Sequence, residues 1–205
     1  MRFTMNMTAG TFTASRRFLC LALALLLLTA PAQAGTVSQE QKLILGMVSV
    51  NTATLNPLLA VEREFMSLTG LVYDSLIVIN DDYYPAPGLA ERWESSPDGS
   101  SWTFTLREGV FFHNGAMLTA QDVVSTIDEI LRLANDEAAA NKGAYSTLKY
   151  FVNKITATDE RTVVITTPRK NFGFLYAMNF PILPQAQGQA DNPIGSGPYT
   201  VEQFM

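Results

Sequence analysis

Apolar and polar positions along the chain follow two periods, one of two residues and one of three to four residues. Alternation and short apolar runs are typical of strands, whereas spacings of three and four residues are typical of helices that bury one face. The pattern predicts helices over residues 61–79 and 120–134, and strands over residues 42–50, 101–106, 110–112, 155–158, 162–166 and 200–204.

The helix over residues 120–134 has the strongest signal. Thr119 and Asp122 match the capping box, in which the hydroxyl accepts a backbone N–H and the acid reaches back to the N-cap. The apolar residues that follow form one stripe, and they are Val123, Val124, Ile127, Ile130, Leu131 and Ala134.

Turn sequences separate these elements. Asn80–Asp82, Pro97–Ser100 and Asn114-Gly115 are rich in the residues that tight turns favour, and residues 85–88 are predicted to be a surface connection. Asp159-Glu160 joins the strands 155–158 and 162–166 in a predicted hairpin. Strands and helices are thus mixed throughout, which indicates an α/β fold.

The first 34 residues have the pattern of an export signal. Two arginines precede an apolar run over residues 18–30, and Ala32-Gln33-Ala34 matches a small-residue cleavage site. A run of 13 residues is shorter than the roughly 20 that cross a bilayer, which favours a cleaved leader over a permanent anchor. The sequence therefore predicts an exported protein that starts near residue 35.

Composition then narrows the classes of function. Residues 1–34 hold three of the 14 basic residues and no acidic residue, so their removal changes the formal net charge from −5 to −8. Such an acidic chain lacks the basic face that nucleic-acid binding requires. The single cysteine, Cys20, lies in the leader, and the rest of the chain has no disulfide and no cysteine-based metal site.

Candidate catalytic motifs are isolated. His113 is the only histidine, and metal sites and general-base sites need converging partners. Ser146 and Lys149 match S-x-x-K, but the S-D-N and K-T-G motifs of penicillin-recognising enzymes are absent. Gly195-Ser196-Gly197 lacks the G-K-[ST] ending of a phosphate loop. We therefore predict no catalytic residue, no metal site, no cofactor and no enzymatic activity.

Six segments, in order along the chain, resemble the extracellular solute-binding proteins of family 5, the oligopeptide, dipeptide and nickel binders of ABC importers. They cover residues 55–57, 73–76, 87–93, 98–112, 114–123 and 195–199. The resemblance implies a type II periplasmic-binding-protein-like fold of two lobes with an extra small domain. Only its N-terminal part would be present in this chain.

The resemblance also implies how the chain is divided. Residues 1–34 would be the signal peptide, 35–75 the start of the first lobe and 76–185 the extra small α/β domain. Residues 186–205 would return into the first lobe, and the second lobe would lie outside the chain. Trp93, Trp102, Phe104 and Phe112 are expected in the core of the small domain.

By resemblance, the function would be capture of peptides or similar small solutes in the periplasm, followed by delivery to an ABC permease through lobe closure. First-lobe ligand contacts would come from Val61, Glu62, Arg63 and Tyr145, and the full-length protein would be a monomer. Two alternatives are an exported serine acyl enzyme that uses Ser146 and Lys149, and an interaction domain without a ligand.

Overall fold

The computed structural model describes residues 56–59, 62–138, 141–171, 173–185 and 193–202, all within one compact unit that spans Gly46–Met205. The predicted leader, the strand predicted over residues 42–50 and the candidate Val61 lie outside the described residues. Within the described part, no helix has both the length and the apolar character that a membrane crossing requires.

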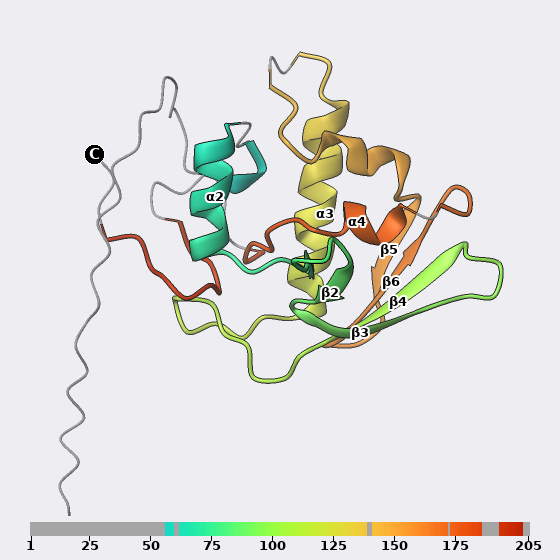
Figure 1. The fold of residues 1–205 in the computed structure, drawn as a ribbon, viewed down its shortest axis with the longest axis horizontal. Helices are drawn as coiled ribbons and strands as arrows, with labels where there is room; N and C mark the ends of the chain where they lie inside the picture. The colour runs from blue at the N-terminus through green and yellow to red at the C-terminus, as the bar shows by residue number, and fades with distance from the viewer. Residues whose placement is uncertain (1–55, 60–61, 139–140, 172, 186–192, 203–205) are drawn as a thin grey trace, which may run out of the picture. The chain divides into compact units, whose positions relative to one another are not determined.

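A four-stranded antiparallel sheet, in the order β3-β4-β6-β5, is the centre of the fold (Figure 1). Its strands are β3 (Ala90–Ser95), β4 (Ser101–Leu106), β5 (Lys154–Ala157) and β6 (Thr162–Thr166). The register aligns Trp93, Phe104 and Val163, so these side chains share one face. β4 and the hairpin of β5 and β6 confirm the predicted strands, whereas β3 was not predicted.

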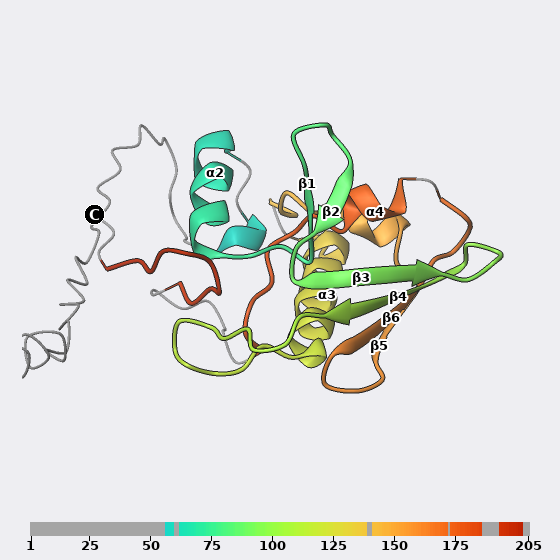
Figure 2. The same ribbon diagram turned by 60° about the horizontal axis from the view of Figure 1, so that its bottom comes forward.

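The helix α3 (Ala120–Asn135) packs against this sheet through β5 and β6, as Figure 2 shows. It confirms the prediction from the apolar stripe, since Val123 and Ile127 are fully buried. The predicted capping box is formed, because the Asp122 carboxylate accepts hydrogen bonds from the Thr119 backbone N–H at 2.8 Å and from its hydroxyl at 2.9 Å.

Aromatic side chains pack together on one face of the sheet. The short helix α4 (Phe174–Ala177) places Phe174 against Trp102, with ring centroids 5.1 Å apart, and against Phe104 at 6.2 Å. Phe104 and Phe112 are buried, and Trp93 and Trp102 are partly buried against the same cluster. These four residues therefore pack in the core, as the sequence predicts.

The prediction of one helix over residues 61–79 is wrong in its second half. The helix α2 (Arg63–Val72) ends where Tyr73 adopts an extended backbone, with φ −122° and ψ 135°. The chain then forms β1 (Ile77–Ile79), which pairs antiparallel with β2 (Pro85–Pro87). The β-branched side chains of β1 favour a strand over a helix. Leu76 lies at the spacing expected for the apolar face of a helix, but only by coincidence.

Two further predictions are corrected. Residues 85–88 were predicted as a surface connection, but β2 pairs with β1 there. Residues 110–112 form no regular strand, because only an isolated bridge joins Phe111 to Met117. Residues 200–202 of the strand predicted over 200–204 are irregular, and the remaining residues lie outside the described part.

The segments that enter and leave the sheet region lie side by side. An isolated antiparallel bridge joins Ser75 to Pro181, and the N–H of Ile182 donates to the carbonyl of Asp74 at 3.0 Å. Farther along, the N–H of Leu183 donates to the Thr126 hydroxyl of α3 at 3.1 Å. The returning segment is thus held both by the outgoing segment and by the helix.

The turn between β3 and β4 is organised around the Asp98 carboxylate. Its oxygens accept hydrogen bonds from the hydroxyls of Ser96 and Ser100, at 2.5 and 2.7 Å, and from the Ser100 N–H at 3.1 Å. These bonds, with that of Ser96 the strongest, lower the pKa of Asp98 from its ordinary value of 3.8 to about 2.

We expect this turn to stay ordered at and above the ordinary pKa of 3.8 and to lose its hydrogen bonds as the pH falls through about 2. The folded carboxylate has the lower pKa, so its contribution is present above the unfolded value and is lost in acid. An NMR titration of the Ser100 amide measures the midpoint. Asp98→Asn should abolish the transition, and a midpoint at the ordinary value would contradict the prediction.

Candidate functional site

The first turn of α2 carries two of the predicted ligand residues. Glu62 is the N-cap residue and is half-buried, whereas Arg63 begins the helix and is exposed. The Arg63 carbonyl accepts a hydrogen bond from the Ser67 hydroxyl at 3.0 Å, which is a contact within the helix. Two residues of opposite charge therefore follow each other at the start of one helix.

The loop after α3 carries the other predicted residue, Tyr145. Its ring is half-buried and meets the Phe180 ring edge-on, with centroids 6.3 Å apart. This burial raises the pKa of the Tyr145 hydroxyl above its ordinary value of 10.0. Among the described residues, the Tyr145 hydroxyl has no hydrogen-bond partner, and its ring is held against Phe180.

Contacts between the loop and the segment before α2 bring these two regions together. The Asn141 side chain donates to the carbonyl of Leu59 at 2.9 Å, and Leu59 ends the 3₁₀ helix η1 (Pro57–Leu59). At Gly143 a Cβ would collide with the Leu58 carbonyl, so only glycine permits this approach. The loop that carries Tyr145 and the segment before Glu62 are therefore neighbours in the fold, although the contacting residues are 82 apart in the sequence.

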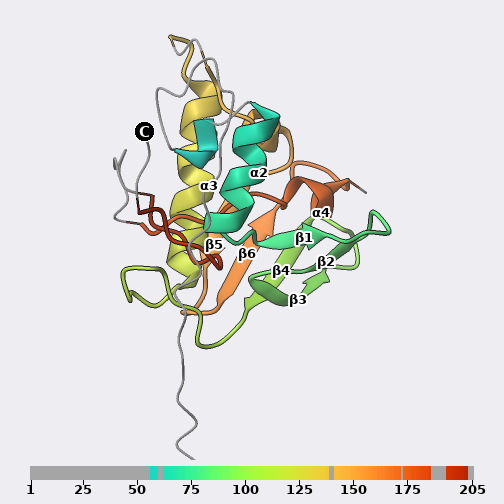
Figure 3. The same ribbon diagram turned by 60° about the vertical axis from the view of Figure 1, so that its left-hand side comes forward.

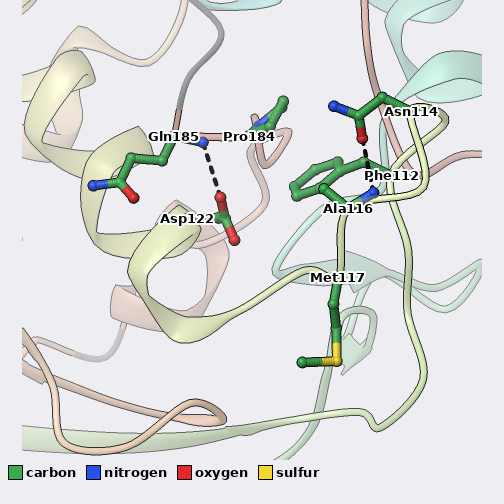
Figure 4. Close-up of a pocket in the computed structure, with 7 residues that line it drawn as sticks. All are labelled: Phe112, Asn114, Ala116, Met117, Asp122, Pro184 and Gln185. Carbon is green, nitrogen blue, oxygen red and sulfur yellow. Dashed lines mark hydrogen bonds between the residues drawn. The ribbon is translucent and has the colours of Figure 1, made fainter.

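A separate hollow of about 270 Å³ lies between residues 112–117, the start of α3 and residues 184–185 (Figure 4). Phe112, Met117 and Pro184 give it a mostly apolar wall, and Glu62, Arg63 and Tyr145 do not line it. The Asp122 carboxylate in its wall is already occupied, because it accepts the Gln185 N–H at 2.8 Å as well as its capping bonds. Its volume is also below the 300–1,000 Å³ typical of ligand pockets.

His113 is a structural residue. Its Nδ1 accepts the N–H of Gly195 at 3.2 Å, and its Nε2 lies 2.8 Å from the carbonyl oxygen of Gly197. These partners require a neutral ring that carries its proton on Nε2, because a backbone N–H needs an acceptor and a carbonyl needs a donor. With both nitrogens occupied, the ring cannot also bind a metal ion.

The Gly195–Tyr199 segment that His113 holds closes the end of α2. The N–H groups of Gly197 and Tyr199 donate to the carbonyls of Val72 and Leu71, at 2.9 and 3.0 Å. Pro198, which has no N–H, lies between the two donors. The glycines allow the backbone to approach the helix end, so this motif is a helix-capping connection and not a phosphate loop.

The remaining candidates show no catalytic arrangement. Lys149 donates from its Nζ to the carbonyl of Ala134 at 3.4 Å, near the end of α3. Two acidic residues next to other acids are also occupied, since Glu129 forms an ion pair with Arg132 and the Asp159 carboxylate accepts the N–H of Arg161 at 2.8 Å. In the described part of the chain, no three histidine, cysteine, aspartate or glutamate residues are grouped as a metal site would need.

Comparison with known sequences identifies similar proteins. The profile of "Bacterial extracellular solute-binding proteins, family 5 Middle" matches residues 84–205. The dipeptide-binding protein of Escherichia coli (strain K12) is 33% identical over 144 residues, covering 58% of this chain and 27% of that protein. The nickel-binding periplasmic protein of the same organism is 27% identical over 165 residues, covering 75% and 30%.

Comparison with solved structures also identifies similar proteins. NikA from Brucella suis, in complex with Fe(III)-EDTA, superposes with a TM-score of 0.65 at 30% identity, covering 76% of this chain and 32% of that one. The periplasmic binding protein DppA from Helicobacter pylori, in complex with peptide STSA, gives 0.63 at 25%, covering 75% and 35%. The chain therefore spans between about a quarter and about a third of the length of these relatives.

Proposed function

Because the chain belongs to the bacterial extracellular solute-binding proteins of family 5, we propose that it forms the N-terminal part of a solute receptor. Its fold is that of the periplasmic binding proteins, of which it covers about a third. The receptor would capture a peptide or similar small solute in the periplasm and deliver it to an ABC permease. The observation that carries the proposal is the family match over residues 84–205.

The geometry of the candidate site supports a peptide ligand. Glu62 and Arg63 supply opposite charges at the start of α2, which suits the charged ends of a peptide. The Tyr145 ring comes from the loop that contacts the segment before this helix. Aromatic side chains provide apolar area together with a polar tip. We propose these three residues as first-lobe ligand contacts, with Val61 as a fourth from outside the described part.

The further parts of the proposal rest on the same family. Residues 1–34 would be a cleaved signal peptide, and the segments 35–75, 76–185 and 186–205 would be the start of the first lobe, the small domain and the return. The full-length receptor would act as a monomer without enzymatic activity. The acyl-enzyme alternative receives no support from geometry, because Lys149 is directed to the end of α3.

Ligand binding by the full natural chain tests the function. We expect a panel of dipeptides and oligopeptides to include ligands that raise the melting temperature and give saturable heats in calorimetry, without turnover. Nickel ions and sugars serve as competing classes. Failure of every peptide to bind the correctly folded protein would contradict the proposal, and covalent labelling by a β-lactam that Ser146→Ala abolishes would favour the enzyme.

With a peptide ligand in hand, Tyr145→Ala is expected to weaken binding about tenfold, the equivalent of about 1.4 kcal/mol. The cause would be the loss of a half-buried ring from the ligand contact. Tyr145→Phe separates the contribution of the hydroxyl from that of the ring. Tyr150→Ala is the matched control, since this tyrosine lies five residues farther along and is 64% exposed. Equal effects of Tyr145→Ala and the control would remove Tyr145 from the site.

A further inference from the structure

The tip of the β1–β2 hairpin carries two exposed aromatic residues. Tyr83 is 80% exposed and Tyr84 is 66% exposed, which makes them the two most exposed large apolar side chains in the described part of the chain. Figures 2 and 3 show the hairpin projecting beyond the sheet and away from α3. Tyrosine is a common interface residue because it combines a large apolar ring with a polar tip.

The turn holds Tyr83 outward in an unfavourable backbone conformation. Its φ of +65° lies in the left-handed region, which no other non-glycine residue adopts in the described part. Asn80 fixes the turn, since its side-chain oxygen accepts the N–H groups of Asp82 and Tyr84 at 3.1 and 2.8 Å. Glycine or asparagine fits this conformation better than a bulky aromatic residue. The fold therefore does not explain the choice of tyrosine.

The charged residues of the turn are both acidic. Asp81 and Asp82 are exposed, and neither forms an ion pair with another described residue. No lysine or arginine occurs in the sequence between Arg63 and Arg92. Carboxylates bind guanidinium groups through paired hydrogen bonds, and tyrosine rings bind them over their faces. The carboxylates and the tyrosine rings of the tip are thus both suited to bind an arginine side chain.

Pairing of a partner strand with this hairpin is a less favourable mode of recognition. Pro85 and Pro87 occupy two of the three positions of β2, and proline has no N–H to donate to another strand. Recognition at the tip would therefore run through side chains.

We propose that residues 81–84 form a docking surface for an arginine-bearing surface of a partner protein. The proposal stands apart from the ligand site, because it uses the tip of a hairpin and not α2 or Tyr145. A surface of this kind exposes two rings and two carboxylates at a protruding point, which is suited to insertion between the cationic side chains of a partner.

A peptide of alternating arginine and glycine is the probe, titrated at low ionic strength against the full natural chain. The double variant Tyr83→Asn with Tyr84→Ser is expected to raise the dissociation constant about fivefold or more, because each ring contributes a cation–π contact. The control is Tyr150→Ser with Tyr176→Ser, which removes two other exposed tyrosines without changing the charge. It should leave the dissociation constant unchanged, and a lysine–glycine peptide should bind the unmodified protein more weakly.

Stability separates this role from a structural one. Because asparagine tolerates a positive φ, Tyr83→Asn should melt at the same temperature as the unmodified protein or higher, while its binding falls. Equal losses in both double variants would mean that exposed tyrosines bind the probe wherever they lie. No loss in either variant, or no preference for arginine, would mean that net charge alone attracts the probe. Each of these results would overturn the proposal. Protection of Tyr83 and Tyr84 from nitration would also overturn it, because another part of the chain would then cover the tip.

Discussion

Replacement of Gly195 by alanine is expected to destabilise the fold by about 3 kcal/mol or more. A Cβ at this position would collide with the carbonyl group of Val72, which is backbone and cannot turn aside. The Tyr73 ring lies 3.0 Å from the same point, so the new methyl group has no free direction. The segment would have to leave the end of α2, and its capping hydrogen bonds would be lost.

The same helix provides the control. Gly70 lies inside α2 and is exposed, and a Cβ there would meet nothing within 4 Å. Gly70→Ala should therefore stabilise the protein by about 0.5–1 kcal/mol, as expected for glycine in a helix interior. Urea unfolding followed by circular dichroism measures both variants. If Gly195→Ala unfolded at the midpoint of the unmodified protein, the close approach to Val72 would be disproved.

Replacement of Asp122 by alanine is expected to lower the free energy of unfolding by about 3 kcal/mol. One buried carboxylate, 7% exposed, accepts the N–H and the hydroxyl of Thr119 and the N–H of Gln185. Alanine removes the Asp122 half of the capping box and also leaves the N–H of Gln185 without its acceptor. The two losses differ in kind, since one acts on α3 and the other on the returning segment.

Two variants make this prediction specific. Asp128→Ala removes an exposed carboxylate from the same helix and should change the free energy of unfolding by less than about 0.5 kcal/mol. Asp122→Asn keeps one acceptor oxygen but lacks the charge. Its loss in free energy of unfolding should therefore lie between those of Asp128→Ala and Asp122→Ala. Hydrogen exchange of the Gln185 amide reports the second loss directly. Unchanged exchange in Asp122→Ala would show that another group holds this segment.

The sequence predicts the elements whose signals are local. The capping box of Thr119 and Asp122 and the apolar stripe of α3 lie within one segment, and the helix has the predicted extent to within one residue. The hairpin of β5 and β6 is also local, because Asp159-Glu160 turns the chain between two alternating runs. In each case one short stretch contains both the pattern and its boundaries.

The missed elements depend on distant partners. β3 has only Ala90 and Trp93 directed toward the core, with charged residues between them, so it shows little alternation. β2 consists of Pro85-Ala86-Pro87, which is an unfavourable strand sequence and pairs only because β1 lies beside it. The end of α2 at Val72 is likewise set by the Gly197 N–H, which comes from 125 residues farther along the chain.

In the candidate site, too, contacts between distant segments could not be predicted from local patterns. Resemblance points to Glu62, Arg63 and Tyr145, but no local pattern shows that their segments are neighbours. That information lies in the Asn141 contact with Leu59 and in the absence of a side chain at Gly143. The hydrogen-bonding role of His113 was equally hidden, because both of its partners are backbone groups more than 80 residues away.

The bridge between Ser75 and Pro181 has a consequence for how such a chain can change over time. The segment between these residues begins and ends at adjacent points, so its removal would leave two ends that a short connection could rejoin. An insertion at the same place would likewise leave the surrounding backbone undisturbed. The bridge would thus let the intervening segment grow or shrink while the path of the flanking chain stays the same.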